Sequence, residues 1–304
     1  GMTINRRGLL ISGGAGIGLV VAWGLWPRTY APNLVANPGE TPFGAWLKIG
    51  TDGHVTVAVP QVEHGQGVYT TLPQIVADEL GADWRTIGVE PAPLNPLYAN
   101  PIGTHDLFEG VFDRLPDGTP QPPMLTGGSS SIRMFERACR EAGAGARALL
   151  CMAAAKRWDA DWTQVNVEAG FCTFGAKRIR FAELAEEAAK FTLPDPLPLG
   201  IQGAGKLVGK SVPRLDTPSK VDGSANFAGD VRLADMVHAA IRQGPVGGRL
   251  TRVDRAAADS IRGVLSVVEN PRWVAAIATT GWAAQKALDA LAPRFENDAP
   301  LADT

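Results

Sequence analysis

Residues 59–80 read VPQVEHGQGVYTTLPQIVADEL, and this stretch decides the fold that we predict. Before the glycines, valines occupy every second position from 55 to 59, which is the period expected of a strand with one buried face. After them, the apolar residues at positions 72, 75, 76 and 80 have helical spacing, with Pro73 expected in the first turn. The sequence therefore predicts a strand, a two-glycine loop and an amphipathic helix.

The loop of this unit, Gly65–Gln66–Gly67, leads into the start of the predicted helix. Backbone N–H groups are free at a helix N-terminus, and together with the helix dipole they favour an anionic or acceptor-rich ligand. Gln66 offers donors and an acceptor, which suit the mixed polar edge of a pterin or an oxo group better than a metal. The alternative is a turn whose glycines only permit positive φ. We interpret His64 as a residue that orients the loop rather than as an acid or base.

A second stretch, TGGSSSI at residues 126–132, opens a predicted helix that runs to Arg157. A serine before a helix is a normal N-cap, but capping needs only one serine. The two glycines and three serines of residues 127–131 provide more donors and backbone access than a cap uses, which favours a cradle for a phosphate or a pterin edge. A long proline-rich connection separates this stretch from the first one.

The string from Gln61 to Leu80 resembles the glutamine–glycine motif of molybdenum hydroxylase large subunits. It is most similar to that of the isoquinoline 1-oxidoreductase beta subunit and its relatives among aldehyde dehydrogenases, and the match extends past the glycines through Gln74–Val76. The same family carries a glycine–serine loop at the place of residues 127–131 and uses it against the pyranopterin. The resemblance implies molybdopterin as the cofactor, with the cytosine dinucleotide form as an alternative. It implies these cofactor-binding residues: Gly65, Gln66, Gly67, Val68, Gly127, Gly128, Ser129, Ser130 and Ser131.

Four regions follow from composition and from the same resemblance. Residues 1–42 are a signal and linker, and residues 43–198 are a partial molybdopterin-binding domain that ends at the prolines and glycines of residues 194–205. Residues 205–291 resemble the α/β hammerhead module of these enzymes, although Gly244 stands where many relatives have a serine before the proline. Residues 292–304 are a tail. The expected fold class is α+β.

The resemblance implies a molybdenum hydroxylase large subunit that inserts water-derived oxygen into an aromatic N-heterocycle or an aldehyde. In that family the dithiolene of the pterin holds the metal, so no protein side chain is expected as a metal ligand. The family's base is a glutamate near the carboxy terminus, and no Gly–Glu motif of that kind occurs before Thr304. We therefore expect no catalytic residue in this chain, and a missing continuation or second large-subunit chain that carries the base. The alternatives are a cofactor-binding subunit of a split enzyme without activity alone, and a degenerate interaction module.

Composition sets the remaining expectations. The 304 residues carry a net charge of −2 and no run of Lys or Arg, so nucleic acid is excluded as a partner. Cys139, Cys151 and Cys172 lack Cys-x-x-Cys spacing and cannot hold an iron–sulfur cluster. We interpret Cys139 and Cys151 as small buried side chains, and we expect iron–sulfur clusters on a small two-cluster partner subunit.

Arg6 and Arg7 precede an apolar, glycine-rich run from Leu9 to Trp26. This layout is typical of a twin-arginine export signal, which predicts a periplasmic protein. An ordinary hydrophobic anchor or a buried helix is the alternative, and an uncleaved signal would also serve as a membrane anchor.

Overall fold

The computed structural model describes residues 30–109, 111, 114, 123–200 and 206–297. The chain divides into two compact units, Gly1–Ser224 and Ala225–Thr304, each with its own sheets and hydrophobic core. The predicted export signal, with Arg6, Arg7 and the apolar run after them, lies outside the described residues. Among the helices in the described ranges, none is long and apolar enough to cross a membrane.

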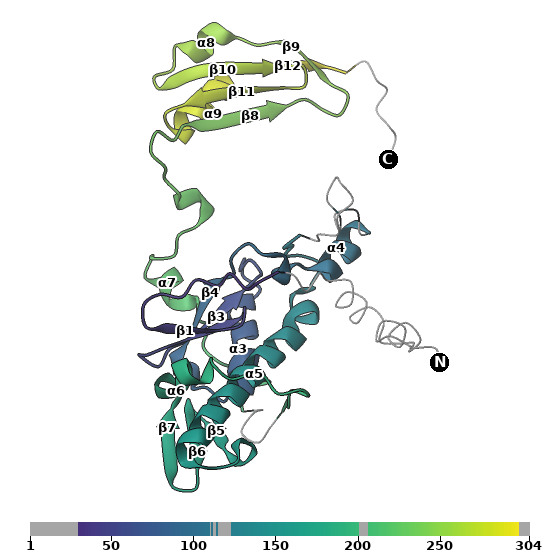
Figure 1. Ribbon diagram of the computed structural model, residues 1–304. Coiled ribbons are helices and arrows are strands. Elements are labelled where there is room, and N and C mark those ends of the chain that lie inside the picture. The colour runs from purple at the N-terminus through teal and green to yellow at the C-terminus, as the bar shows by residue number, and fades with distance from the viewer. Residues whose placement is uncertain (1–29, 110, 112–113, 115–122, 201–205, 298–304) are drawn as a thin grey trace, which may run out of the picture. The chain divides into compact units, whose positions relative to one another are not determined.

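The first unit is built on a four-stranded sheet of order β1-β2-β3-β4 (Figure 1). Its strands are β1 (Glu40–Phe43), β2 (Leu47–Gly50), β3 (Val55–Val59) and β4 (Ile87–Pro91). The first three pair antiparallel, whereas β4 joins β3 in parallel. The alternating valines of β3 are at most 2% exposed, which confirms the predicted strand, but Ala58 on the other face is also buried. Both faces of β3 are therefore covered, as is usual for a strand in a parallel pair.

Helix α3 (Val68–Leu80) begins directly after the two-glycine loop, as predicted, and returns the chain to β4. Gly67 and Gly81 flank the helix with positive φ. The expectation that Pro73 lies in the first turn is wrong, because the helix already begins at Val68. Pro73 lies in the second turn, where it removes the helical hydrogen bond to the carbonyl of Tyr69.

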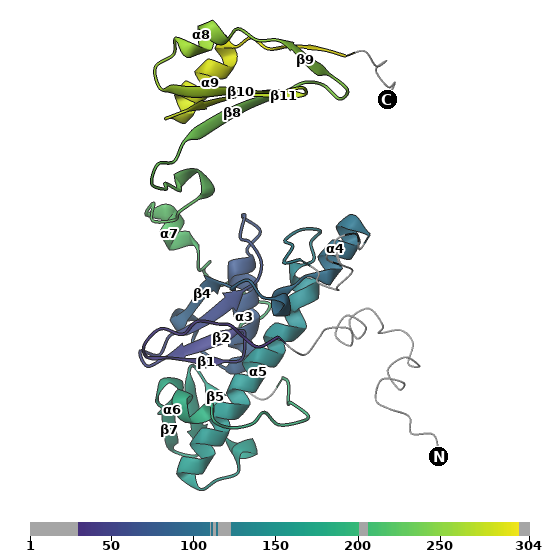
Figure 2. The ribbon, with the colours of Figure 1, turned by 45° about the horizontal axis from the view of Figure 1, so that its top comes forward.

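The long helix α5 (Ser131–Trp158) packs against α3 (Figure 2). A Cβ on Gly143 would meet the carbonyl oxygen of Val76 at 2.5 Å, so only glycine allows this close approach. Arg147 and Glu79 form a buried ion pair between the helices, with Nη1 and Oε2 3.4 Å apart and both side chains 3% exposed. Arg140 Nη1 lies 3.2 Å from the other oxygen of Glu79. Removing Glu79 would leave the buried charge of Arg147 without its carboxylate partner, so this change should strongly destabilise the contact between the two helices.

Short elements complete the first unit. A second sheet, of order β5-β6-β7, precedes α6. The bounds are α4 (Pro101–Phe108), β5 (Asn166–Glu168), β6 (Phe171–Phe174), β7 (Lys177–Arg180), α6 (Phe181–Ala188) and α7 (Thr217–Val221), with 3-10 turns at Trp84–Thr86, Pro96–Tyr98 and Trp162–Gln164. Cys139 and Cys151 are free and buried, which confirms the interpretation as small core side chains.

Residues 206–216, which we call the strap, pack back onto α3. The N–H of Leu207 donates to Asp78 Oδ1 over 2.7 Å, and Gln74 Nε2 donates to the carbonyl oxygen of Leu207 over 2.6 Å. The strap therefore belongs to the first unit, and the units divide after Ser224, later than the boundary expected at residues 194–205. The physical reason is that the polar side chains of α3 satisfy backbone groups of the strap. The assignment of these regions as a cofactor-binding part domain and a hammerhead domain stays a prediction.

The second unit is a three-stranded antiparallel sheet of order β10-β11-β8 and a separate pair, β12-β9. Figure 2 shows α8 and α9 on one face of the three-stranded sheet. The bounds are β8 (His238–Gln243), β9 (Arg249–Arg252), α8 (Arg255–Asp259), β10 (Val264–Asn270), β11 (Trp273–Ala278), α9 (Gly281–Ala290) and β12 (Arg294–Glu296), after a 3-10 turn at Ala228–Asp230. The mixture of helices and sheets in both units agrees with the expected α+β class, and the hammerhead assignment stays a prediction.

Candidate functional site

The two-glycine loop joins β3 to α3 and is exposed from His64 to Gln66. Gly65 and Gly67 have φ values of 112° and 90°, as the turn alternative requires. A Cβ on either glycine would meet nothing within 4 Å. The backbone conformation therefore requires glycine, and the space beside both residues is open to a ligand.

Glu63 lies in the glycine loop, and its carboxylate binds the N–H groups at the start of α3. Its Oε1 accepts hydrogen bonds from the N–H groups of Gly65 at 2.7 Å and Gly67 at 3.1 Å, and its Oε2 accepts one from Tyr69 at 3.0 Å. Three of the N–H groups that we expected to be free for a ligand are thus bonded to a side chain of the loop itself. Sequence reasoning missed this role, although an acidic residue just before a helix is a known stabilising pattern.

The carboxyl of Glu63 is ionised at neutral pH. Its side chain is 5% exposed, and this burial acts to raise its pKa. The hydrogen bonds from the N–H groups of Tyr69, Gly67 and Gly65 outweigh burial and hold the pKa below the usual value of a glutamate. The helix N-terminus is therefore already neutralised by a buried carboxylate.

Gln66 points its side-chain amide back onto the loop. Its Oε1 accepts from the N–H of His64 at 2.8 Å, and its Nε2 donates to the carbonyl oxygen of Val62 at 2.7 Å. An amide nitrogen carries two N–H groups, so one donor of Gln66 remains. In the described part of the chain, the backbone N–H groups of Gln66 and Val68 also have no acceptor. Gln66 thus holds the shape of the loop, as in the turn alternative. Its backbone N–H and one N–H of its side-chain amide are still available to a ligand at the predicted site.

The structure brings the two predicted stretches together through Gln61, which is 2% exposed. Its Nε2 donates to the carbonyl oxygen of Leu125 at 3.1 Å, and its Oε1 accepts from Ser131 Oγ at 2.8 Å. Beside it, the N–H of Val62 donates to Thr126 Oγ1 at 2.8 Å. The glycine loop and the glycine–serine stretch therefore form one surface.

The glycine–serine stretch is less open than we expected. Ser130 is fully buried, and its Oγ donates to the carbonyl oxygen of Gly127 at 2.7 Å. Ser131 donates to Gln61. Two of the three serines therefore hold the loops in place. A Cβ on Gly127 would meet the side chain of Leu107 at 2.9 Å and one on Gly128 would meet it at 3.3 Å, although Gly128 itself is exposed. Ser129 remains exposed, with a φ of 51°.

Asn100 is a further buried residue of the site that sequence reasoning missed. It is 0% exposed, and its Nδ2 donates to Leu125 O at 2.8 Å and to Ser130 Oγ at 2.7 Å. Its Oδ1 accepts from the N–H of Gly103 at 2.9 Å and so caps α4. An asparagine before a proline signals a helix start, but the contact with Ser130 cannot be read from that signal.

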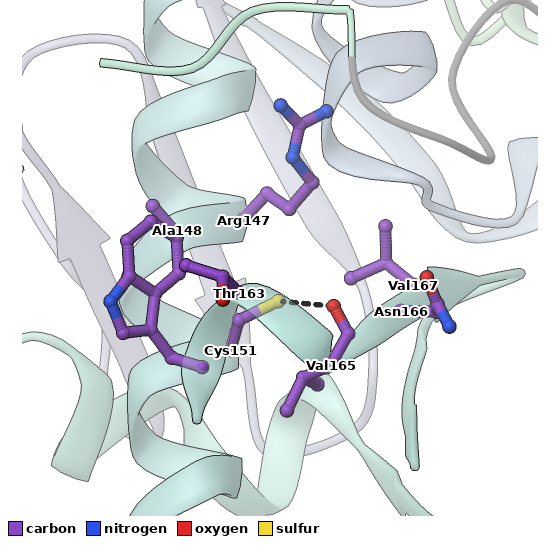
Figure 3. Close-up of a pocket in the computed structure, with 8 residues that line it drawn as sticks. Arg147, Ala148, Cys151, Thr163, Val165, Asn166 and Val167 are labelled. Carbon is purple, nitrogen blue, oxygen red and sulfur yellow. Dashed lines mark hydrogen bonds between the residues drawn. The ribbon is translucent and has the colours of Figure 1, made fainter. Parts of the chain in front are cut away.

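The small hollow drawn in Figure 3 lies elsewhere and contains none of the predicted site residues. It has a volume of about 20 Å³ and lies between α5 and the chain around β5, where Cys151 Sγ donates to the carbonyl oxygen of Val165 at 3.7 Å (Figure 3). A hollow of this size holds about one water molecule. Within the described ranges, no group of three or more His, Cys, Asp or Glu side chains could hold a metal ion.

Residues 7–98 match the sequence model of the molybdopterin cofactor-binding domain. This match includes the glycine loop and ends before the glycine–serine stretch. The chain is also similar to the isoquinoline 1-oxidoreductase beta subunit of Brevundimonas diminuta, with 29% identity over 90% of this chain and 38% of that protein.

Two further relatives have similar identities. A membrane-bound aldehyde dehydrogenase (pyrroloquinoline-quinone) of Gluconacetobacter polyoxogenes is 27% identical over 95% of this chain and 37% of its own length. A nicotinate dehydrogenase subunit of Pseudomonas putida is 27% identical over 78% of this chain and 19% of its own length. The chain thus spans at most 38% of these relatives, which fits an amino-terminal part, and the resemblance to this group of enzymes is confirmed.

Proposed function

We propose that this chain is the molybdopterin-binding portion of a molybdenum hydroxylase large subunit of the aldehyde dehydrogenase or isoquinoline 1-oxidoreductase type. The observation that carries the proposal is the junction of the two loops at Gln61, which makes one surface from stretches far apart in the sequence. The match of residues 7–98 to a molybdopterin-binding domain supports the same assignment.

The donor set of the glycine loop fits a pterin or an oxo group. The backbone N–H groups of Gln66 and Val68 and the second N–H of the Gln66 amide are available among the described residues, beside two glycines with open space. Ser129, exposed at the edge of the second stretch, would add a hydroxyl. These residues would hold the cofactor by neutral donors, with the loop shaped beforehand by Glu63 and Gln61. When bound, the cofactor supplies the redox centre for transfer of water-derived oxygen to an N-heterocycle or aldehyde.

The rest of the catalytic apparatus would come from other polypeptide. The proposed base is a glutamate in a continuation of the large subunit or in a second large-subunit chain, and a small two-cluster iron–sulfur subunit would take the electrons. Two of the relatives are named as single subunits of their enzymes, which supports an assembly of several chains. A cofactor-binding subunit of a split enzyme without activity alone is the second candidate.

We also propose that the protein is exported in folded form to the periplasm. The supporting observation is the pair Arg6 and Arg7 before an apolar, glycine-rich run. A cofactor loaded before export would fit this route, which carries folded proteins.

The function is tested by co-expressing the chain with a gene for the proposed second half and measuring molybdenum and pterin in the purified complex. We expect the wild-type complex to carry both. Gln66→Ala is expected to lower the content, since loss of one hydrogen bond to a polar ligand group costs about 1 to 3 kcal/mol of affinity. The variant also loses the exposed hydrogen bonds with His64 and Val62, so the content is measured well below the unfolding temperature of both proteins. Gln285→Ala, an exposed glutamine of α9, is the control and should leave the content unchanged. A wild-type complex free of molybdenum and pterin would refute the proposal.

A further inference from the structure

Arg214 contacts the glycine loop from the strap, 151 residues further along the chain than Glu63. Its Nη2 donates to Glu63 Oε1 at 3.2 Å, and its Nη1 donates to the carbonyl oxygen of Gly65 at 3.1 Å. One guanidinium therefore binds a side-chain oxygen and a backbone oxygen of the loop at the same time. This arrangement uses the fixed fork geometry of arginine.

The guanidinium is itself held in place by its own segment. Arg214 Nε and Nη2 donate to the two carboxylate oxygens of Asp216 at 3.0 and 2.9 Å. Lys220 binds the same carboxylate, whose side chain is 9% exposed. The N–H of Leu215 donates to Thr70 Oγ1 at 3.2 Å, which ties the strap backbone to α3. The orientation of Arg214 is thus set within the folded first unit.

These contacts keep the charges around the loop balanced. Two carboxylates, Glu63 and Asp216, face the two cations Arg214 and Lys220. The hydrogen bond from Arg214 holds the pKa of Asp216 well below its usual range, and Asp216 in turn raises the pKa of Arg214. Glu63, Asp216 and Arg214 are therefore ionised at neutral pH, and Glu63 can act as an acceptor at every one of its hydrogen bonds.

We propose that Arg214 is a positioning residue of the glycine loop. It holds the carboxylate of Glu63 on the N–H groups of Gly65, Gly67 and Tyr69, and it thereby keeps the N–H groups of Gln66 and Val68 available to the cofactor. Its role toward the cofactor rests on the proposed function, whereas its role in shaping the loop does not. The strap, which lies beyond the residues that match the cofactor-binding domain, is then part of the binding apparatus.

The first test measures amide hydrogen exchange of the whole chain without cofactor, in peptides that span residues 63–70. Arg214→Gln is expected to speed exchange of the Gly65, Gly67 and Tyr69 amides about three- to tenfold, because Glu63 loses the cation that holds it. Arg214→Lys keeps the charge and should restore part of the protection. Arg242→Gln is the matched control: Arg242 also pairs with an aspartate, at 2.8 Å, and is 43% exposed against 39% for Arg214.

The second test measures molybdenum and pterin content of the same variants in the co-expressed complex. We expect a severalfold loss in Arg214→Gln, partial recovery in Arg214→Lys, and no change in Arg242→Gln. Should Arg214→Gln fail to fold, Arg214→Lys is compared with wild type instead, since an ammonium keeps the charge but cannot bind Glu63 and the carbonyl of Gly65 in the fork geometry of arginine. Unchanged exchange at the three amides would overturn the positioning role, and faster exchange with full cofactor content would overturn its link to binding. A wild-type complex without cofactor refutes the proposed function instead and leaves the exchange result to decide the loop-shaping role.

Discussion

Replacing Glu63 with glutamine tests how the glycine loop is held. The wild-type carboxylate accepts three backbone hydrogen bonds and one from Arg214. A glutamine amide has one oxygen and one NH₂ group, so in either orientation its nitrogen faces N–H donors where an acceptor stood. If the amide oxygen keeps the place of Oε1, the N–H of Tyr69 loses its partner. If it takes the place of Oε2, the N–H groups of Gly65 and Gly67 lose theirs.

The expected cost follows from burial and from the type of bond. A hydrogen bond to a charged group contributes about 1.5 to 3 kcal/mol, and the Glu63 side chain is 5% exposed, so water replaces little of it. Arg214 is 39% exposed, so we add at most about 1 kcal/mol for its contact with Glu63. Glu63→Gln should therefore lower the free energy of unfolding by about 2 to 4 kcal/mol.

The lowered pKa of Glu63 also makes its stabilising contribution depend on pH. The pKa of Glu63 is lowered in the folded protein, so its stabilising contribution is present above the unfolded value of about 4.5 and is lost as pH falls through the folded pKa. The difference in unfolding free energy between wild type and Glu63→Gln should thus be full at neutral pH. It should shrink in acid, where the wild-type carboxyl binds a proton.

Urea unfolding of the full chain at neutral and acidic pH measures both effects. Glu141→Gln on α5 is the control, because Glu141 pairs with Arg137 at 2.7 Å in an exposed pair one helical turn apart. That change should cost at most about 0.5 kcal/mol. Equal unfolding free energies for Glu63→Gln and Glu141→Gln would refute the account of Glu63 as the residue that fixes the loop.

Three further predictions concern the loop, the export signal and the unit boundary. Gly67→Ala should lower the free energy of unfolding by about 1 to 2 kcal/mol, because the φ of Gly67 is 90° although a Cβ would have open space. Gly88→Ala in β4 is the control, because Gly88 lacks positive φ, and it should cost less in the same urea titration. Equal costs for the two variants would show that the positive φ of Gly67 is not what requires glycine. Replacing Arg6 and Arg7 with lysine should leave precursor in the cytoplasm, as cell fractionation would show; export at the wild-type level would refute the signal. Limited proteolysis followed by mass spectrometry should cut first within residues 222–237, where the compact units divide, and first cleavage at residues 194–200 would instead support the boundary expected from composition.

Local patterns gave the strand, the loop and the helix correctly. The valines of β3 and the apolar residues of α3 each lie within one short segment. The spacing of these residues along the sequence therefore predicts directly which face of the strand or helix is buried. The positive φ of Gly65 and Gly67 follows equally from local chemistry. Pro73 was placed in the wrong turn because helix starts are known from sequence only to within a few residues.

Contacts between distant segments could not be predicted in the same way. Ser131 meets Gln61 across 70 residues, and Arg214 meets Glu63 across 151. No local sequence pattern indicates that these residues are in contact. For this reason the sequence favours all three serines as ligand donors, whereas in the structure two of them hold the loops together. The backbone N–H groups at the start of α3 were expected to be free for the same reason, since only the fold shows that Glu63 fills that position.

The two long-range contacts act on different residues of the glycine loop. Gln61 ties its beginning to the glycine–serine stretch, and Arg214 ties Glu63 and Gly65 to the strap. Gln66 and Val68, whose N–H groups have no acceptor among the described residues, come directly after these tied residues. Because the Glu63 carboxylate is paired with Arg214, the loop offers a phosphate no excess positive charge, only neutral N–H donors. Neutral donors suit an uncharged, acceptor-rich group, so the proposed site favours the pterin edge or an oxo group over the phosphate of the cofactor.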